Sequence, residues 1–156
     1  MFERAVSSYT GNLADIKKEL AEGHFFRAYN YFYLLKFFGG VPVVTKVLDV
    51  TSPELYGKRN SRYEVVNLIL SDLDEAIAGL PLEQNITSAD KGKISKQAAQ
   101  AFKARVLLYE ATWRKYNGTS TDFEGSAGPA SDQVNTFLEE SVQLSEIVMG
   151  LSLIHI

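Results

Sequence analysis

Hydrophobic residues recur every three or four positions over four stretches of the chain, which is the period of an amphipathic α-helix. The pattern predicts helices over residues 12–38, 62–79, 96–116 and 132–149. The first helix is strongly aromatic, since eight aromatic residues fall between residues 25 and 38. Four consecutive amphipathic segments indicate an all-α fold.

Residues at the helix ends support these boundaries. Ser61 and Glu64 have the spacing of a capping box at the start of the second helix. Ser95 is a candidate N-cap for the third helix and Asn12 for the first. Gly23 lies inside the first helix, where it lowers helix propensity and permits a bend.

Two long loops are expected between the helices, over residues 39–61 and 117–131. Within the first loop, residues 41–50 are β-branched and apolar, but Pro42 disfavours a central strand. We therefore expect an extended segment that lies against the helices. The fold is predicted to consist of tetratricopeptide-like helical hairpins, although the helix spacing departs from the ~34-residue period of that repeat and its signature is absent. Loops this long in a helical domain are usually functional or belong to a larger assembly.

The sequence also predicts how one face of each of two helices packs. The third helix is rich in alanine, and Ala98, Ala101 and Ala104 are expected to form its most closely packed face. The fourth helix is expected to expose an apolar face formed by Val134, Phe137, Leu138 and Val148.

Composition and charge narrow the function classes. With 46% hydrophobic and 22% charged residues, the 156-residue chain has the make-up of a folded globular domain rather than of a disordered segment. Its net charge of −3 disfavours a nucleic-acid binder that acts through bulk charge. The absence of cysteine excludes disulfides, a thiolate nucleophile, a zinc-thiolate site and a lipidation point within this sequence.

The acidic residues Asp72, Asp74 and Glu75 form a cluster with two interpretations. Paired carboxylates can perform acid–base chemistry or bind calcium. The simpler interpretation, which we favour, is a solvated helix face with one internal ion pair. Arg27 lies within the aromatic helix, where an unpaired guanidinium is costly to bury, so we expect it to pair with one of these carboxylates.

Other signals for chemistry are weak. Neither His24 nor His155 lies near a recognisable catalytic partner, and no phosphate-binding loop is present, so we predict no catalytic residue, no metal site and no cofactor. Trp113 and Tyr116 can form an aromatic platform for a sugar ring, but ordinary core packing is the interpretation we favour.

Three stretches together resemble the SusD-like (SusD/RagB) family. Residues 26–32 (FRAYNYF), running into residues 37–44 (FFGGVPVV), are similar to the signature of its aromatic helix. Residues 63–81 resemble the following helix of the family, and residues 92–109 resemble its alanine-rich block. The order and the spacing of these stretches agree with those of the family over residues 19–149, which is most of the chain.

The resemblance implies a surface lipoprotein of Bacteroidetes that captures glycans or other nutrients without catalysis. It also implies a partner, a SusC-like TonB-dependent outer-membrane transporter, and helical repeats that form the scaffold. Because the family is usually several hundred residues long, residues 1–149 are expected to be a fragment of its helical-repeat domain. Residues 150–156 do not resemble the family and are expected to be a truncation or an artefact.

The resemblance leads to further expectations about the lipid anchor and the ligand-binding residues. The lipid anchor that the family uses to reach the membrane is expected outside this sequence, and no ligand-binding residue of the family can be matched to a position here. Two alternatives stay open, namely an intracellular helical-repeat module for protein interaction and an enzyme that uses the acidic cluster.

Overall fold

The computed structural model of the chain describes residues 8–12, 16–119, 129 and 131–153. In these residues it has four α-helices: α2 (Lys17–Phe38), α3 (Arg62–Gly79), α4 (Lys96–Asn117) and α5 (Val134–Leu153). Three short 3-10 helices lie between them: η2 (Pro53–Leu55), η3 (Glu83–Asn85) and η4 (Ser88–Asp90). No strand occurs in the described part of the chain, so the predicted all-α fold is confirmed.

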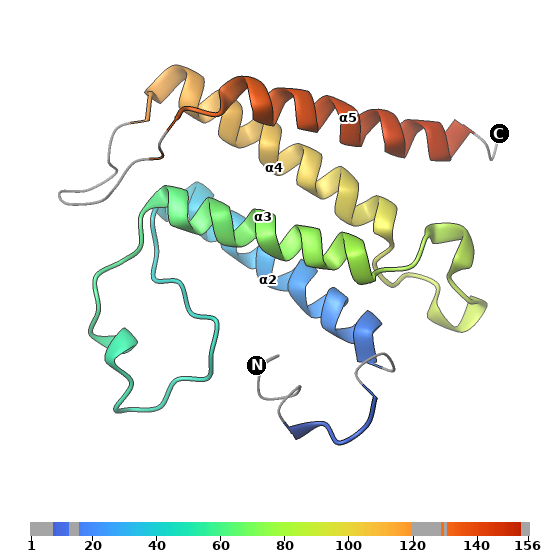
Figure 1. Cartoon of the computed structure of the whole chain (residues 1–156), viewed down its shortest axis with the longest axis horizontal. Coiled ribbons are helices and arrows are strands. Elements are labelled where there is room, and N and C mark those ends of the chain that lie inside the picture. Colours follow the sequence, from blue (N-terminus) through green and yellow to red (C-terminus); the bar gives the residue numbers. More distant parts are fainter. Residues whose placement is uncertain (1–7, 13–15, 120–128, 130, 154–156) are drawn as a thin grey trace.

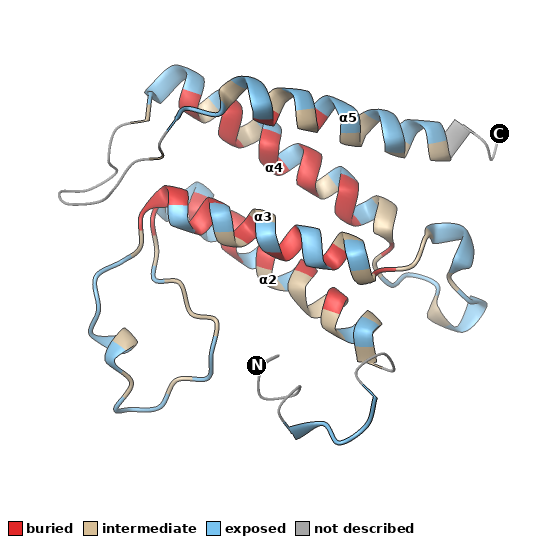
Figure 2. Cartoon of the chain, in the orientation of Figure 1, coloured by how far each residue is buried: buried red, intermediate tan, exposed pale blue. Residues whose placement is uncertain are grey.

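The helices form two antiparallel hairpins (Figure 1). Helix α2 packs against α3, helix α4 packs against α5, and α3 lies against α4 to join the two pairs. The sides of the helices that face one another are the buried sides (Figure 2). The largest apolar side chains that are fully buried are Leu35, Ile69, Leu73 and Leu107.

The predicted start signals of α3 and α4 are confirmed. The Ser61 hydroxyl accepts a hydrogen bond from the Glu64 backbone N–H at 3.2 Å, and the Glu64 carboxylate accepts one from the Ser61 N–H at 2.7 Å. The Ser95 hydroxyl likewise accepts a bond from the Ala98 N–H at 3.2 Å. These caps satisfy backbone donors that have no partner inside a helix.

Helix α2 differs from the prediction at its start and agrees at its end. It begins at Lys17, so Asn12 lies outside the helix and does not cap it. The helix continues without a break through Gly23. It ends where Gly39 adopts a φ of 68°, and the Gly39 N–H donates to the Leu35 carbonyl at 3.0 Å. Glycine reaches this left-handed region at little cost, so the end of the helix is set locally.

The prediction that Ala98, Ala101 and Ala104 form the closely packed face of α4 is wrong for two of these residues. Ala98 and Ala101 are exposed, whereas Ala99, Ala104 and Ala111 are buried. The buried alanines lie on the same stripe as the bulky core residues of α4, and that stripe fixes how the helix is rotated toward its neighbours.

The apolar face of α5 also differs from the prediction. Phe137 is buried, and its ring lies 4.8 Å from the Arg114 guanidinium. Among the side chains of α5 that the structure describes, the large apolar ones that are exposed are Val142, Ile147 and Met149. The helix continues to Leu153, and the assignment of residues 150–156 to an artefact stays a prediction, because residues 154–156 lie outside the described chain.

An ion pair between Asp90 and Lys18 connects the segment between α3 and α4 to the start of α2. The Asp90 carboxylate in η4 lies 2.7 Å from the Lys18 ammonium and 2.7 Å from the Lys93 ammonium. These two cations lower the pKa of Asp90 from its ordinary value of 3.8 to about 2. A lowered pKa means that the charged form stabilises the folded chain.

A glycine permits the close approach of α2 and α3. A Cβ atom built at Gly79 would lie 2.6 Å from the Ala21 Cβ and 3.3 Å from the Lys17 carbonyl oxygen. Both neighbours belong to helix α2 and neither is the end of a flexible side chain. The two helices therefore fit only because position 79 lacks a side chain.

We expect Gly79→Ala to lower the free energy of unfolding by about 1–3 kcal/mol, because the added methyl group forces the helices apart. Chemical denaturation measures the change. Gly150→Ala is the matched control, since nothing lies within 4 Å of a Cβ at that helical position. The control should stabilise the chain by up to about 1 kcal/mol. Equal effects of the two substitutions would contradict the close approach.

We expect Asp90→Asn to destabilise the chain at neutral pH and to lose this effect in acid. Because the folded pKa is lowered, the stabilisation is present above about 3.8 and disappears as the pH falls toward 2. Thermal unfolding of both proteins across this range measures the difference, with Glu75→Gln on the exposed face of α3 as the control. A difference that does not change with pH would contradict the ion pair.

Candidate functional site

Both long loops leave the bundle at the same end. Helices α2 and α4 end there and helices α3 and α5 begin there, at the left of Figure 1. The first loop joins α2 to α3, and the second joins α4 to α5. This loop end of the bundle is the candidate functional region, because long loops on a rigid scaffold often carry binding residues.

The first part of the first loop is held against α2. The Tyr31 hydroxyl accepts a hydrogen bond from the Val44 N–H at 2.7 Å. The Asn60 side-chain oxygen accepts one from the Val43 N–H at 2.7 Å, and the Asn60 N–H donates to the Val41 carbonyl at 3.2 Å. The predicted extended segment against the helices is therefore confirmed for residues 41–44, whereas Val47 and Val50 farther along are exposed.

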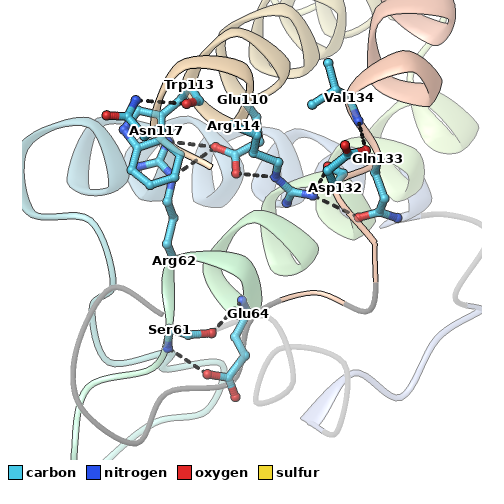
Figure 3. A network of polar contacts seen from close by, with 10 residues as sticks. All are labelled: Ser61, Arg62, Glu64, Glu110, Trp113, Arg114, Asn117, Asp132, Gln133 and Val134. Atoms are coloured by element: carbon cyan, nitrogen blue, oxygen red, sulfur yellow. Dashed lines mark hydrogen bonds and ion pairs between the residues drawn. The ribbon is translucent and has the colours of Figure 1, made fainter. Parts of the chain in front are cut away.

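A buried carboxylate holds two arginines at the loop end (Figure 3). One Glu110 oxygen accepts hydrogen bonds from Arg62 Nη2 at 2.7 Å and Nε at 3.1 Å. The other oxygen accepts one from Arg114 Nε at 2.8 Å. All three side chains are at most 3% exposed. We call these three residues the Glu110 cluster; it links the first residue of α3 to the last turns of α4.

Arg114 extends this cluster to the start of α5. Its Nη1 donates to the Asp132 carbonyl and to the Gln133 side-chain oxygen, each at 3.0 Å. Gln133 has a φ of 57°, which is uncommon for a residue other than glycine. The Asp132 carboxylate accepts from the Val134 N–H at 3.2 Å. The end of the second loop is thus fixed by the same arginine that pairs with Glu110.

Trp113 and Tyr116 do not form ordinary core packing, so the favoured interpretation of this pair was wrong. Trp113 is half-buried, and its ring lies 3.9 Å from the Arg62 guanidinium. Tyr109, one turn earlier, has its ring 5.8 Å from the same guanidinium. Tyr116 is 78% exposed. The sequence could not show this, because the partner of Trp113 is a charged residue on another helix.

These aromatic residues border a groove along the exposed side of α4. Its volume is about 440 Å³, within the range typical of small-molecule sites. Its lining, which defines the α4 groove, consists of Arg105, Leu108, Tyr109, Thr112, Trp113, Tyr116 and Asn117.

A second groove of about 540 Å³ lies between α2 and the extended part of the first loop. It is bordered by Phe26, Arg27 and Leu34 on α2 and by Thr45 and Lys46 on the loop. Its two cationic side chains already pair with acidic residues of the chain. The α4 groove is therefore the better candidate for a polar ligand.

Arg27 makes the ion pair that the sequence predicted. Its Nε and Nη2 atoms donate to the two oxygens of Asp72, each at 2.6 Å. Asp72 is 3% exposed and also lies 2.7 Å from His24 Nδ1. This bidentate pair joins α2 to α3, and His24 contributes to the same contact rather than to a catalytic site.

The other acidic residues of the cluster point elsewhere. Asp74 lies 2.6 Å from the Lys103 ammonium, and Lys103 also reaches Glu140 on α5 at 2.5 Å. Burial acts to lower the pKa of Lys103, but the two carboxylates outweigh this and raise it. Glu75 is exposed. Asp72 and Asp74 therefore serve separate ion pairs, and the structure does not bring them together as a catalytic pair.

Two features are absent from the described residues. No group of three or more histidine, aspartate or glutamate side chains is arranged to hold a metal ion there. No described helix is both long and apolar enough to cross a membrane. His155 lies outside the described residues.

Comparison with known proteins identifies similar chains. Residues 5–108 match the model of a SusD-like family described as starch-binding and associating with the outer membrane. A SusD-like protein, P38, of Formosa agariphila is 34% identical over 108 residues, which are 69% of this chain and 20% of that protein. The chain thus spans about a fifth of the length of this relative.

Solved structures of the same kind are similar in fold. A SusD-like protein from Bacteroides fragilis is 34% identical, with a TM-score of 0.62 over 72% of this chain and 21% of that one. A structure solved with xylogluco-oligosaccharide is 26% identical, with a TM-score of 0.68 over 94% of this chain and 25% of that one.

We expect Glu110→Gln to lower the free energy of unfolding by about 3–5 kcal/mol, because it removes the charge that pairs with two buried guanidinium groups. Chemical denaturation measures the loss. Glu139→Gln, at an exposed position on α5, is the matched control and should change stability by no more than about 0.5 kcal/mol. A loss for Glu110→Gln no larger than that of the control would refute the role given to the Glu110 cluster.

Proposed function

Since this chain belongs to the SusD-like family, we propose that it forms part of the helical scaffold of a glycan-binding protein at the outer membrane. The family match over residues 5–108 carries this proposal, because it covers α2, α3 and half of α4. The two stacked hairpins supply a support whose helices α2 and α4 end, and whose helices α3 and α5 begin, at the same end of the bundle (Figure 1). The match also favours this function over that of an intracellular interaction module.

The ligand we propose is a glycan or another nutrient. The support comes from the family description, which names starch binding, and from the similar structure solved with xylogluco-oligosaccharide. The parent protein is proposed to be a surface-exposed lipoprotein that delivers its ligand to a SusC-like, TonB-dependent transporter. Its lipid anchor is proposed to lie outside this sequence.

Binding without catalysis is part of the proposal. Asp72 and Asp74, the carboxylates that the sequence offered for acid–base chemistry, are engaged in ion pairs with Arg27 and Lys103. A carboxylate held by a cation on a neighbouring helix is poorly placed to move a proton of a substrate. The role of these residues is to join helices.

The full-length parent protein provides the test. After mild solubilisation of outer membranes, a tagged parent should co-purify with a TonB-dependent transporter. Oligosaccharides incubated with the purified parent should keep their length on chromatography. Recovery of the parent from the cytoplasmic fraction, or shortening of the oligosaccharides, would contradict the proposal.

A further inference from the structure

We propose that the α4 groove is a binding site for a negatively charged glycan, one that carries uronate carboxylates or sulfate esters. This inference rests on the proposed function and adds to it, since it assigns a binding site and a ligand class to the scaffold itself. Three features of the groove support this inference: its aromatic side chains, the contacts that hold Trp113 in place, and the charge of the residues that line it.

The aromatic side chains of the groove suit a sugar ring. Tyr109, Trp113 and Tyr116 succeed one another at helical spacing along α4, and all three line the groove. The flat faces of such rings bury the apolar C–H faces of a pyranose, while the phenolic hydroxyls and the indole N–H remain able to hydrogen-bond. Asn117 and Thr112 add further polar groups at the border.

The central ring is held in place before any ligand arrives. The Arg62 guanidinium lies 3.9 Å from the Trp113 ring, and Glu110 fixes that guanidinium with two hydrogen bonds. A cation that lies over the face of an aromatic ring is attracted to that ring electrostatically. A ring held in this way loses little side-chain entropy on binding, which favours affinity.

The charge of the lining selects the class of glycan. Arg105 is the single charged residue that lines the groove, and it makes no ion pair within the described part of the chain. The one acidic residue of α4 is Glu110, which is buried in its own cluster. A guanidinium can bind a carboxylate or a sulfate through two parallel hydrogen bonds. Among its described lining residues the groove therefore has a cation, which attracts anions, and no carboxylate that would repel them.

The aromatic surface continues from α4 onto α2. Phe102 lies one turn before Arg105, and its ring centroid is 5.5 Å from that of Tyr29. Tyr29 in turn lies 4.8 Å from Tyr33. Aromatic side chains therefore lie on both sides of Arg105.

The test measures binding of three oligosaccharides of equal length to the purified chain by calorimetry. Oligogalacturonate supplies carboxylates, a carrageenan oligosaccharide supplies sulfates, and a laminari-oligosaccharide is neutral. We expect at least one charged oligosaccharide to bind and the neutral one to bind at least about tenfold more weakly. Arg105→Gln and Tyr116→Ala should each weaken the charged complex about tenfold or more, as expected for loss of a charge-assisted bond or a stacking face.

Matched controls lie on the first loop, at positions that do not line the α4 groove. Lys58→Gln removes an exposed cation, and Tyr56→Ala removes a tyrosine that is 81% exposed. Neither should change the affinity, and circular dichroism should show that all variants are folded.

The outcomes separate this inference from the proposed function. Binding of the neutral oligosaccharide as tightly as the charged ones, with no effect of Arg105→Gln, would overturn the ligand class. Absence of binding to all three by the folded chain would overturn the site. Neither result alters the co-purification of the parent with a transporter, which tests the proposed function independently.

Discussion

The carboxylate of Glu110 is the constraint on which the loop end of this fold depends. Two buried guanidinium groups share it, and each belongs to a different boundary between a helix and a loop. Burying a cation without a counter-charge costs several kcal/mol, and Glu110 is the carboxylate that pairs with both Arg62 and Arg114. The start of α3, the end of α4 and the start of α5 are therefore fixed together.

The remaining helix contacts follow the same principle. The pair of Arg27 with Asp72 joins α2 to α3, and Lys103 joins α3, α4 and α5 through two carboxylates. Apolar packing between helices tolerates sliding and rotation, whereas a short ion pair fixes one register. The fold thus combines an apolar core, which supplies most of the burial, with a few ion pairs that define how the hairpins are aligned.

Sequence reasoning succeeded where the controlling interaction is local or follows a strong pattern. Ser61 and Glu64, which form the capping box, are only three positions apart in the sequence. Arg27 was expected to pair with an acid because a guanidinium within an aromatic helix is costly to bury alone, and it pairs with Asp72. It failed for Ala101 and Phe137, because the rotation of a helix about its axis depends on tertiary contacts. Core packing was wrongly favoured over an aromatic platform for Trp113 and Tyr116 for a related reason, since Arg62, the partner of Trp113, is distant in the sequence.

The position of Trp113 has a spectroscopic consequence. It is the single tryptophan of the chain, and it lies beside the Glu110 cluster. Intrinsic fluorescence excited at the indole band therefore originates from one place in the molecule, where helix ends and loop ends meet. Far-ultraviolet circular dichroism, by comparison, sums over all the helices. Together the two signals distinguish loosening of this one end from the melting of the hairpins, without any added label.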